Sequence, residues 1–393
     1  MSPRHAARLD RLQPYMFAQL EQAIAEKREA GIDVISLGIG DPDMPTPDAV
    51  VESLRSAVQR PDTHQYPSNR GRASYREAVA SFYEQRFGVK LDPATQVLPV
   101  LGGKEGIFHI CQALLDAGDV ALGTDPGYPV YTGGPLLTDA EPYLLPITPE
   151  NDFKPDLGSI PADVLSRAKL LFLNYPNNPT GAVIEEGDTF FADVVEFAKA
   201  NDIIVVHDNA YSEISFDGYK APSFLATPGA IDVGVEMFSL SKAWNMTGWR
   251  VGACVGNTEV VSAFWKLKTN IDSGMFDAIQ LAAAAALTEC RSFPDEMSAI
   301  YQRRRDLVID ALRAIGLEPN APKGSIYVWA RVPEGHDSAS FTQLLLDEAN
   351  VVVSPGSSFG AAGEGFIRIS LSTPDDRLRE AIGRIESQLG VRA

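Results

Sequence analysis

The chain has 393 residues, 45% of them hydrophobic, which is enough for one large core and a smaller second one. Its 52 acidic and 34 basic residues give a net charge of −18, which repels polyanions and argues against nucleic acid as a partner. Three scattered cysteines, no apolar run of about 18 residues and no signal-like start predict a cytoplasmic protein without a disulfide framework or membrane span.

The first part of the chain contains the pattern of an α/β fold. Residues 1–45 are expected to be an N-terminal arm that joins a small domain, and a large domain is expected over 46–283. From about residue 95 to 256, short apolar runs alternate with amphipathic segments, which is typical of strands joined by crossover helices. The expected strands are 96–101, 119–123, 169–173, 203–206, 235–238 and 251–255. Their near-continuous apolarity predicts a mostly parallel central sheet that is covered on both faces.

A long helical segment is predicted over 279–315, and the domain boundary is placed there. Downstream, the apolar runs 325–330, 351–354 and 366–371 are expected to be strands of a smaller α+β domain over 284–393. No internal repeat or low-complexity tract is visible, which favours one compact, enzyme-sized protein.

The most informative stretch is Ser239-Leu-Ser-Lys242, which follows an expected strand and precedes Arg250. Strand ends are where open α/β sheets bind ligands. A lysine amine forms an imine with an aldehyde, and a phosphate would be bound by the hydroxyls of Ser239 and Ser241 and by the Arg250 guanidinium. The stretch therefore predicts a pyridoxal 5′-phosphate site, although a surface turn with an incidental lysine is the alternative.

These residues resemble the cofactor-lysine motif of the class I and II aminotransferases of fold type I. The resemblance implies a large domain with a mostly parallel sheet, a smaller α+β domain, and Lys242 as the catalytic residue. Pyridoxal 5′-phosphate is the implied cofactor, held by Lys242 as a Schiff base.

Two further motifs appear in the order that this family implies. Asn178, in Asn-Tyr-Pro-Asn-Asn178-Pro-Thr-Gly181, is implied to bind the phenolic oxygen of the cofactor, as is Tyr211. Asp208, at a strand end, is implied to pair with the pyridine nitrogen, where a carboxylate keeps the ring protonated and a better electron sink. Taken alone, these residues could be a loop turn, a helix N-cap and a core aromatic.

Upstream, Leu101-Gly-Gly103-Lys104 places glycines between a strand and a helix, where backbone amides can bind phosphate. The family implies that Gly103 and Lys104 lie at the phosphate group and that Tyr128 stacks on the cofactor ring. A buried core tyrosine is the alternative for Tyr128.

Near the C-terminus, Arg368 interrupts the apolar run 366–371, where a charge is costly unless a counter-charge meets it. The family implies that Arg368, together with Asn178, binds the substrate, with the guanidinium holding the α-carboxylate. An ion pair with a structural acid is the alternative.

The N-terminal half resembles the LL-diaminopimelate aminotransferases, on Tyr15-Met-Phe17, Ser36-Leu-Gly-Ile-Gly40-Asp-Pro-Asp43 and His64-Gln-Tyr66-Pro. That resemblance implies that Tyr15 and Gly40 contact the substrate. It also implies that Tyr66 reaches the cofactor phosphate of the neighbouring subunit, so that a homodimer shares its active sites. An acidic residue expected near Arg70 is missing, so the residues that would bind the distal end of the substrate stay unassigned.

The expected reaction moves an amino group from an amino acid, with LL-2,6-diaminopimelate as the best guess, to a 2-oxo acid such as 2-oxoglutarate by a ping-pong mechanism. Aspartate, alanine, glutamine and aromatic donors stay open, as does a β-lyase on the same fold. The acidic charge disfavours a cofactor-sensing regulator. The five histidines show no ligand spacing, so no metal site is expected.

Overall fold

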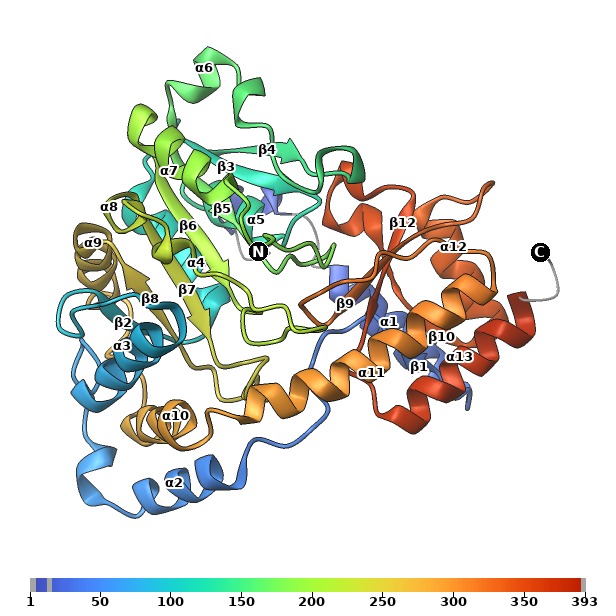
Figure 1. The fold of residues 1–393 in the computed structure, drawn as a ribbon, viewed down its shortest axis with the longest axis horizontal. Coiled ribbons are helices and arrows are strands. Elements are labelled where there is room, and N and C mark those ends of the chain that lie inside the picture. Colours follow the sequence, from blue (N-terminus) through green and yellow to red (C-terminus); the bar gives the residue numbers. More distant parts are fainter. Residues whose placement is uncertain (1–4, 13–15, 390–393) are drawn as a thin grey trace.

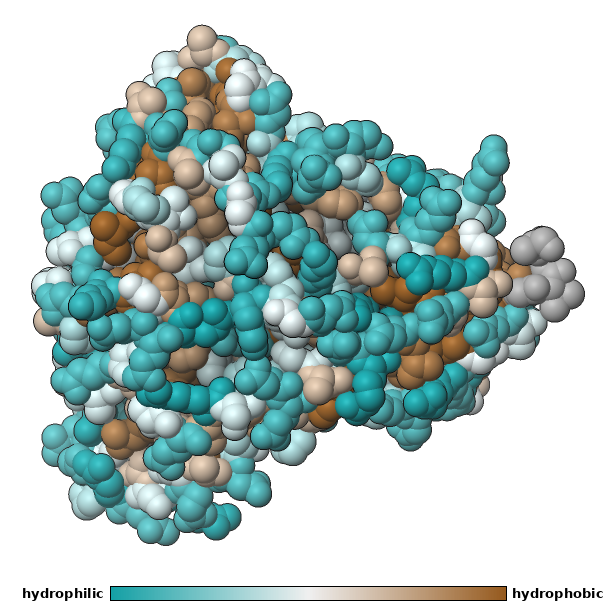
Figure 2. Space-filling model, viewed as in Figure 1, coloured by the Kyte–Doolittle hydropathy of each residue, from teal (hydrophilic) through white to brown (hydrophobic). Residues whose placement is uncertain are grey.

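The structure is a computed structural model that describes residues 5–12 and 16–389, so the predicted substrate contact Tyr15 lies outside the described residues. A larger body built on a seven-stranded sheet and a smaller body are joined by the long helix α11 (Phe293–Ala314) (Figure 1). Hydrophilic side chains cover most of the face shown in Figure 2. Within the described ranges, no helix has the length and apolar character needed to cross a membrane.

The main sheet has the strand order β2-β8-β7-β6-β5-β3-β4. Strand β8 runs antiparallel to its neighbours β2 and β7, and the other neighbouring strands pair in parallel. The strands are β2 (Val97–Val100), β3 (Val120–Asp125), β4 (Glu141–Pro146), β5 (Ala168–Leu173), β6 (Ile204–Asn209), β7 (Gly234–Ser239) and β8 (Gly252–Gly256). The predicted mostly parallel sheet is confirmed, and edge strand β4 is an addition to the predicted set.

Helices cover both faces of this sheet. On one face, Ile107, Ile110 and Phe264 pack against strand residues such as Phe172 and Met237. The helices of the larger body are α2 (Asp48–Val58), α3 (Ala73–Phe87), α4 (Gly103–Leu114), α5 (Val130–Leu136), α6 (Ala162–Leu165), α7 (Phe190–Asn201), α8 (Ala230–Val233), α9 (Thr258–Lys268) and α10 (Asp277–Glu289). This double covering explains why the central strands are apolar on both sides.

The helical segment predicted over 279–315 is two helices, so the prediction of one continuous helix is wrong. Helix α10 ends at Glu289, and α11 begins at Phe293 after the N-cap residue Ser292. The next residue, Pro294, occupies the first turn of α11, where its missing amide costs nothing because that amide has no helical partner. The break lets α10 pack on α2 while α11 leads to the smaller body (Figure 1).

The smaller body contains an antiparallel sheet in the order β11-β12-β9 and a parallel pair of β1 with β10. Its strands are β1 (Ile35–Ser36), β9 (Tyr327–Arg331), β10 (Val351–Val352), β11 (Ser354–Pro355) and β12 (Phe366–Ser370), and its helices are α1 (Met16–Glu29), α12 (Ser338–Leu344) and α13 (Asp375–Leu389). The division into 1–45, 46–283 and 284–393 stays a prediction, and its last boundary falls inside α10.

A buried hydrogen-bond network fixes the strand that carries Asp208. Fully buried Glu236 on β7 accepts hydrogen bonds from Tyr83 Oη at 2.8 Å, Asn209 Nδ2 at 3.0 Å and the backbone amide of Phe224 at 2.7 Å. His207, beside Asp208 on β6, lies 3.0 Å from Glu236 through Nδ1. Burial opposes ionisation of Glu236, but the bonds from His207, Tyr83 and Asn209 hold its pKa below the usual value.

The same histidine also reaches the asparagine loop. Its Nε2 accepts the backbone amide of Tyr175 at 3.2 Å, so Nδ1 carries the proton and donates it to Glu236. Strands β6 and β7 and the loop before Asn178 are thereby held together by one side chain.

Arg304 of α11 anchors the segment that follows β1. Its guanidinium donates to both carboxylate oxygens of Asp43, at 2.7 and 2.9 Å, and to Asp375 of α13 at 2.6 Å. A buried, bidentate pair of this kind fixes orientation as well as position. The segment that contains Gly40, three residues before Asp43, is therefore tied to α11 and α13.

Candidate active site

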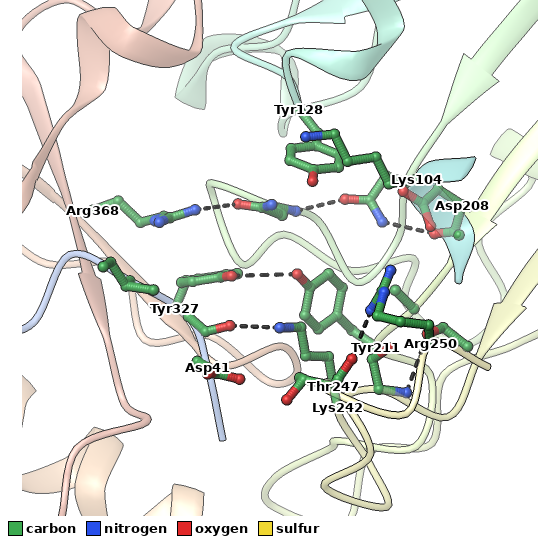
Figure 3. Close-up of a pocket in the computed structure, with 18 residues that line it drawn as sticks. Asp41, Lys104, Tyr128, Asp208, Tyr211, Lys242, Thr247, Arg250, Tyr327 and Arg368 are labelled. Carbon is green, nitrogen blue, oxygen red and sulfur yellow. Dashed lines mark hydrogen bonds between the residues drawn. The ribbon is translucent and has the colours of Figure 1, made fainter. Parts of the chain in front are cut away.

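A cavity of about 350 Å³ lies where the carboxyl ends of the parallel strands face the smaller body (Figure 3). The lining comes from the ends of β6 and β7, from the segments that follow β2, β3, β5, β6 and β7, from β9 and β12, and from the segment after β1. It consists of Ile39, Gly40, Asp41, Gly103, Lys104, Tyr128, Asn174, Asn178, Asp208, Ala210, Tyr211, Ser239, Ser241, Lys242, Thr247, Arg250, Tyr327 and Arg368. The structure therefore gathers the predicted cofactor residues other than Tyr66 around one space.

Lys242 enters this cavity from the turn after β7. Its Nζ donates a hydrogen bond to the carbonyl oxygen of Gly40 at 2.5 Å, which aims the amine across the cavity toward the smaller body. Burial lowers the pKa of Lys242, because the charged ammonium loses its hydration. A larger neutral fraction makes this amine a better nucleophile and base than an exposed lysine.

Asp208 lies at the end of β6. Burial raises the pKa of its carboxyl to about 6, and a hydrogen bond of 2.9 Å from Tyr131 Oη to Oδ2 opposes this rise. In the part of the chain that the structure describes, no lysine or arginine forms an ion pair with Asp208. A buried carboxyl in this condition suits a cationic ligand atom, which would favour its ionised form.

Two asparagines connect Asp208 with Arg368. Asn174 donates from Nδ2 to the backbone carbonyl of Asp208 at 2.7 Å, and its Oδ1 accepts the amide of Asn178, also at 2.7 Å. Asn178 Oδ1 in turn accepts from Arg368 Nη1 at 2.8 Å (Figure 3). The bond between Asn178 and Pro179 is cis.

The Arg368 guanidinium is buried and lies on the side of the cavity formed by the smaller body. It donates from Nη2 to the carbonyl of Gly38 at 2.7 Å, and its Cζ lies 4.0 Å from the ring centre of Tyr327. A planar guanidinium held in this way is suited to a carboxylate.

Tyr327 and Tyr211 meet beside Lys242. Their hydroxyl oxygens are 3.4 Å apart, and both side chains are buried. A Cβ atom placed on Gly40 would lie 2.1 Å from the Tyr327 hydroxyl, so the close approach of these two residues requires glycine at position 40.

One end of the cavity gathers hydrogen-bond donors. Gly102, with φ of +89°, leads into Gly103 at the N-terminus of α4, and Ser239 and Ser241 follow β7. Arg250 donates to the carbonyls of Thr247 at 2.7 Å and Leu101 at 3.4 Å. No carboxylate of the described chain forms an ion pair with Arg250, so this end suits a phosphate group.

Tyr66 does not line the cavity of its own chain. Its side chain is 89% exposed, which leaves it accessible to another molecule. Arg70, near which the sequence lacks the expected acid, lies with its Cζ 4.1 Å from the ring centre of Trp265 and is outside the lining.

Tyr131, Asn174, Thr247 and Tyr327 also lie at the site, and no role was predicted for them from the sequence. Asn174 stands at the start of the quoted asparagine motif, and Tyr131 follows Tyr128 by three residues, so both had a usable signal. Tyr327 lies in an apolar run, where a tyrosine cannot be told from a core residue.

Comparison with known proteins identifies the family over almost the whole chain. The family model described as aminotransferase class I and II matches residues 32–385. LL-diaminopimelate aminotransferase of Moorella thermoacetica is 50% identical over 387 residues, which cover 98% of this chain and 99% of that protein. Its counterpart from Dehalococcoides mccartyi is 51% identical over 378 residues, or 96% and 97% of the two chains.

Solved structures agree. Substrate-bound BacF from Bacillus subtilis is 39% identical with a TM-score of 0.93, covering 98% of both chains. A Thermus thermophilus aspartate aminotransferase mutant is 29% identical with a TM-score of 0.91, covering 98% of this chain and 100% of that one. The fold predicted from the cofactor-lysine motif is therefore confirmed, and the chain belongs to the class I and II aminotransferase family.

Proposed function

We propose that this aminotransferase uses pyridoxal 5′-phosphate to move an amino group between LL-2,6-diaminopimelate and 2-oxoglutarate. One observation carries the proposal: the same cavity is lined by Lys242, whose pKa burial lowers, and by Asp208, whose pKa burial raises to about 6. The identity of about one half with LL-diaminopimelate aminotransferases, over nearly full length, supports the choice of amino donor.

The residues of the cavity would meet this cofactor at five places. Gly103, Ser239, Ser241 and Arg250 form the donor cluster that would hold its phosphate, with Lys104 on the same wall. Asp208 would pair with its ring nitrogen, and Tyr128 would lie on its ring. Lys242 would bind it covalently, and Asn178 and Tyr211 would hydrogen-bond its phenolic oxygen. When bound, the cofactor supplies an electron sink for the pair of electrons left at the substrate α-carbon.

The protein's own groups divide the remaining work. Arg368 would hold the substrate α-carboxylate, with Asn178, Gly40 and Tyr15 as the other proposed contacts. Once the substrate amine has taken its place on the cofactor, the Nζ of Lys242 would take the proton from the α-carbon and pass it to the cofactor, and in the second half-reaction it would return a proton to the α-carbon. Because burial lowers the pKa of Lys242, a larger fraction of this amine is neutral and able to accept the proton than in an exposed lysine.

Initial-rate kinetics with several amino donors tests this function. With LL-diaminopimelate and 2-oxoglutarate, parallel double-reciprocal lines are expected, because both substrates use one site in turn. The kcat/KM for LL-diaminopimelate should exceed that for aspartate, alanine, glutamine or phenylalanine by about 10²-fold or more, since unmatched polar groups cost binding.

A different preferred donor would overturn the specificity and leave the family unchanged. Intersecting lines would contradict the ping-pong mechanism. Release of pyruvate from a sulfur amino acid without an added oxo acid would favour a β-lyase on the same fold.

The pairing of Asp208 with the cofactor nitrogen predicts a pH dependence of cofactor binding. Protonation of Asp208 in the free protein, with a pKa of about 6, removes its charge, so affinity should fall as pH drops below that value. The Tyr131→Phe variant loses the hydrogen bond that favours the charged carboxylate, which should move the midpoint to higher pH.

Quenching of tryptophan fluorescence by pyridoxal 5′-phosphate between pH 5 and 8 measures this effect. The matched control is Asp208→Asn, in which this part of the pH dependence should disappear while the contribution of Lys242 stays. An unchanged midpoint in Tyr131→Phe would contradict the assignment.

We further propose a homodimer in which Tyr66 completes the phosphate site of the partner. Tyr66 is 89% exposed, and two residues earlier the ring of His64 lies 6.1 Å, between ring centres, from that of Phe276, which is 39% exposed. Sedimentation should give a dimer, and Tyr66→Phe should weaken cofactor binding. A stable monomer with full activity would contradict this arrangement.

A cytoplasmic location is part of the same proposal. Cys111, Cys254 and Cys290 are free thiols, as suits a reducing compartment. Cell fractionation tests the location, and recovery of the protein outside the cytoplasm would contradict it.

A further inference from the structure

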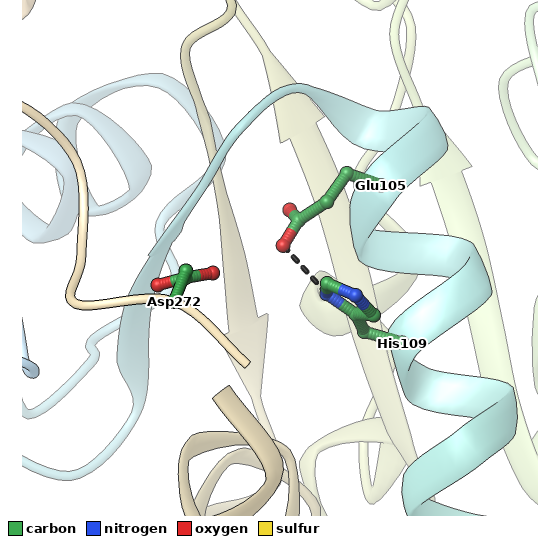
Figure 4. Close-up of side chains that lie close together, drawn as sticks. All are labelled: Glu105, His109 and Asp272. Carbon is green, nitrogen blue, oxygen red and sulfur yellow. Dashed lines mark hydrogen bonds and ion pairs between the residues drawn. The ribbon is translucent and has the colours of Figure 1, made fainter. Parts of the chain in front are cut away.

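A group of ionisable side chains lies outside the cavity, next to the turn formed by Gly102 and Gly103, which is called the glycine turn below (Figure 4). Glu105 and His109 come from α4, and Asp272 comes from the segment after α9; their nearest ligand atoms lie within 4.8 Å of one another. The buried ammonium of Lys268 donates to Glu105 Oε1 at 2.9 Å and to Asp272 Oδ2 at 2.7 Å. A lysine therefore already supplies the positive charge between these carboxylates, and the group is an ion-pair network.

The network reaches the cavity through Glu105. Its Oε2 accepts the backbone amide of Leu101 at 2.9 Å, and its Oε1 lies 2.6 Å from His109 Nδ1. Leu101 directly precedes Gly102 and Gly103, and its carbonyl accepts from Arg250. From the first turn of α4, Glu105 thus fixes Leu101, the residue that leads into Gly102 and Gly103 and whose carbonyl accepts from Arg250.

The surroundings of Glu105 stabilise its ionised form. Burial opposes ionisation, but the hydrogen bond from His109 and the nearby Lys268 ammonium lower the pKa of this carboxyl. The carboxylate is therefore available to hold the Leu101 amide and the Lys268 ammonium together.

Asp272 extends the network in the other direction. Its Oδ1 accepts the amide of Gly274 at 2.8 Å, which orders the segment after α9. A Cβ atom on Gly274 would lie 3.1 Å from the carbonyl of Ser68 and 3.3 Å from Pro67, so this segment packs on the loop that follows Tyr66. Lys268 therefore links the glycine turn to the Tyr66 loop.

We propose that Glu105, Lys268 and Asp272 form a positioning brace for phosphate binding, which sets the Gly102–Gly103 turn and supports the loop that carries Tyr66. The inference rests on the proposed cofactor, because the phosphate is the group that both segments would bind. Lys268 is the centre of the brace, since without its ammonium two carboxylates would face each other in a buried place.

The test compares two ligands in the full-length Lys268→Met variant. Dissociation constants are measured for pyridoxal 5′-phosphate and for pyridoxal, which lacks the phosphate. The variant should bind pyridoxal 5′-phosphate about tenfold more weakly, as expected for the loss of one well-placed hydrogen bond, and should bind pyridoxal within about twofold of wild type.

Two further variants make the result specific. Glu105→Gln keeps an acceptor oxygen for the Leu101 amide but loses the charge, so it should show the same selective loss to a smaller extent. It decides the matter if Lys268→Met does not fold. Lys220→Met removes an exposed lysine paired with Asp295 and should change neither constant.

An equal loss for both ligands, or no loss for either, would overturn the brace. If wild-type protein failed to bind pyridoxal 5′-phosphate at all, the proposed cofactor would fall and the brace with it. Tight wild-type binding with an unchanged ligand ratio in Lys268→Met and Glu105→Gln would overturn the brace alone.

Discussion

The parallel pairing of β5, β6 and β7 is the constraint on which the site depends. Leu173 pairs with His207, and Asp208 pairs with Met237, so the ends of the three strands lie side by side. The loops that leave these ends must then enter the same space. Asparagines from the loop after β5, Asp208 from the end of β6 and Lys242 from the turn after β7 meet there because the backbone register brings them together.

Burial gives these residues their chemistry. Burial lowers the pKa of Lys242 and raises that of Asp208, so both pKa values move toward neutrality. The cavity that these residues line, of about 350 Å³, is of the size that small cofactors occupy. A ligand with an aldehyde, a basic ring nitrogen and a phosphate would meet a matching group at each of these points. The smaller body completes the cavity with Arg368, whose buried guanidinium suits the carboxylate common to amino acids and oxo acids.

Much of this arrangement could be read from the sequence. The central strands were predictable because they are apolar on both faces. The cofactor residues were predictable because they match the motifs of the class I and II aminotransferases, and all of them except Tyr66 line the cavity at the ends of these strands. Edge strand β4 contains Pro142 near its start and Pro146 at its end. Because proline cannot donate a backbone hydrogen bond and is rare in strands, this segment was not predicted as a strand. The break between α10 and α11 had a local signal in Ser292 and Pro294, which a search for apolar periodicity alone passes over.

Other features had no local signal. Lys268 and Glu105 are 163 positions apart, and each looks like an ordinary charged residue of an amphipathic helix. Tyr131 and Tyr327 look like core aromatics until the fold turns their hydroxyls toward Asp208 and Tyr211. Such contacts depend on which helix or strand faces which, and this is decided by the fold as a whole.

The most direct test of the account is to find which lysine binds the cofactor. The protein is mixed with pyridoxal 5′-phosphate, reduced with borohydride, digested and analysed by mass spectrometry. A phosphopyridoxyl group is expected on Lys242 and none on Lys104, which faces the same cavity. Modification of Lys104 or another lysine in place of Lys242, or no modification, would contradict the assignment of this cavity as the catalytic site.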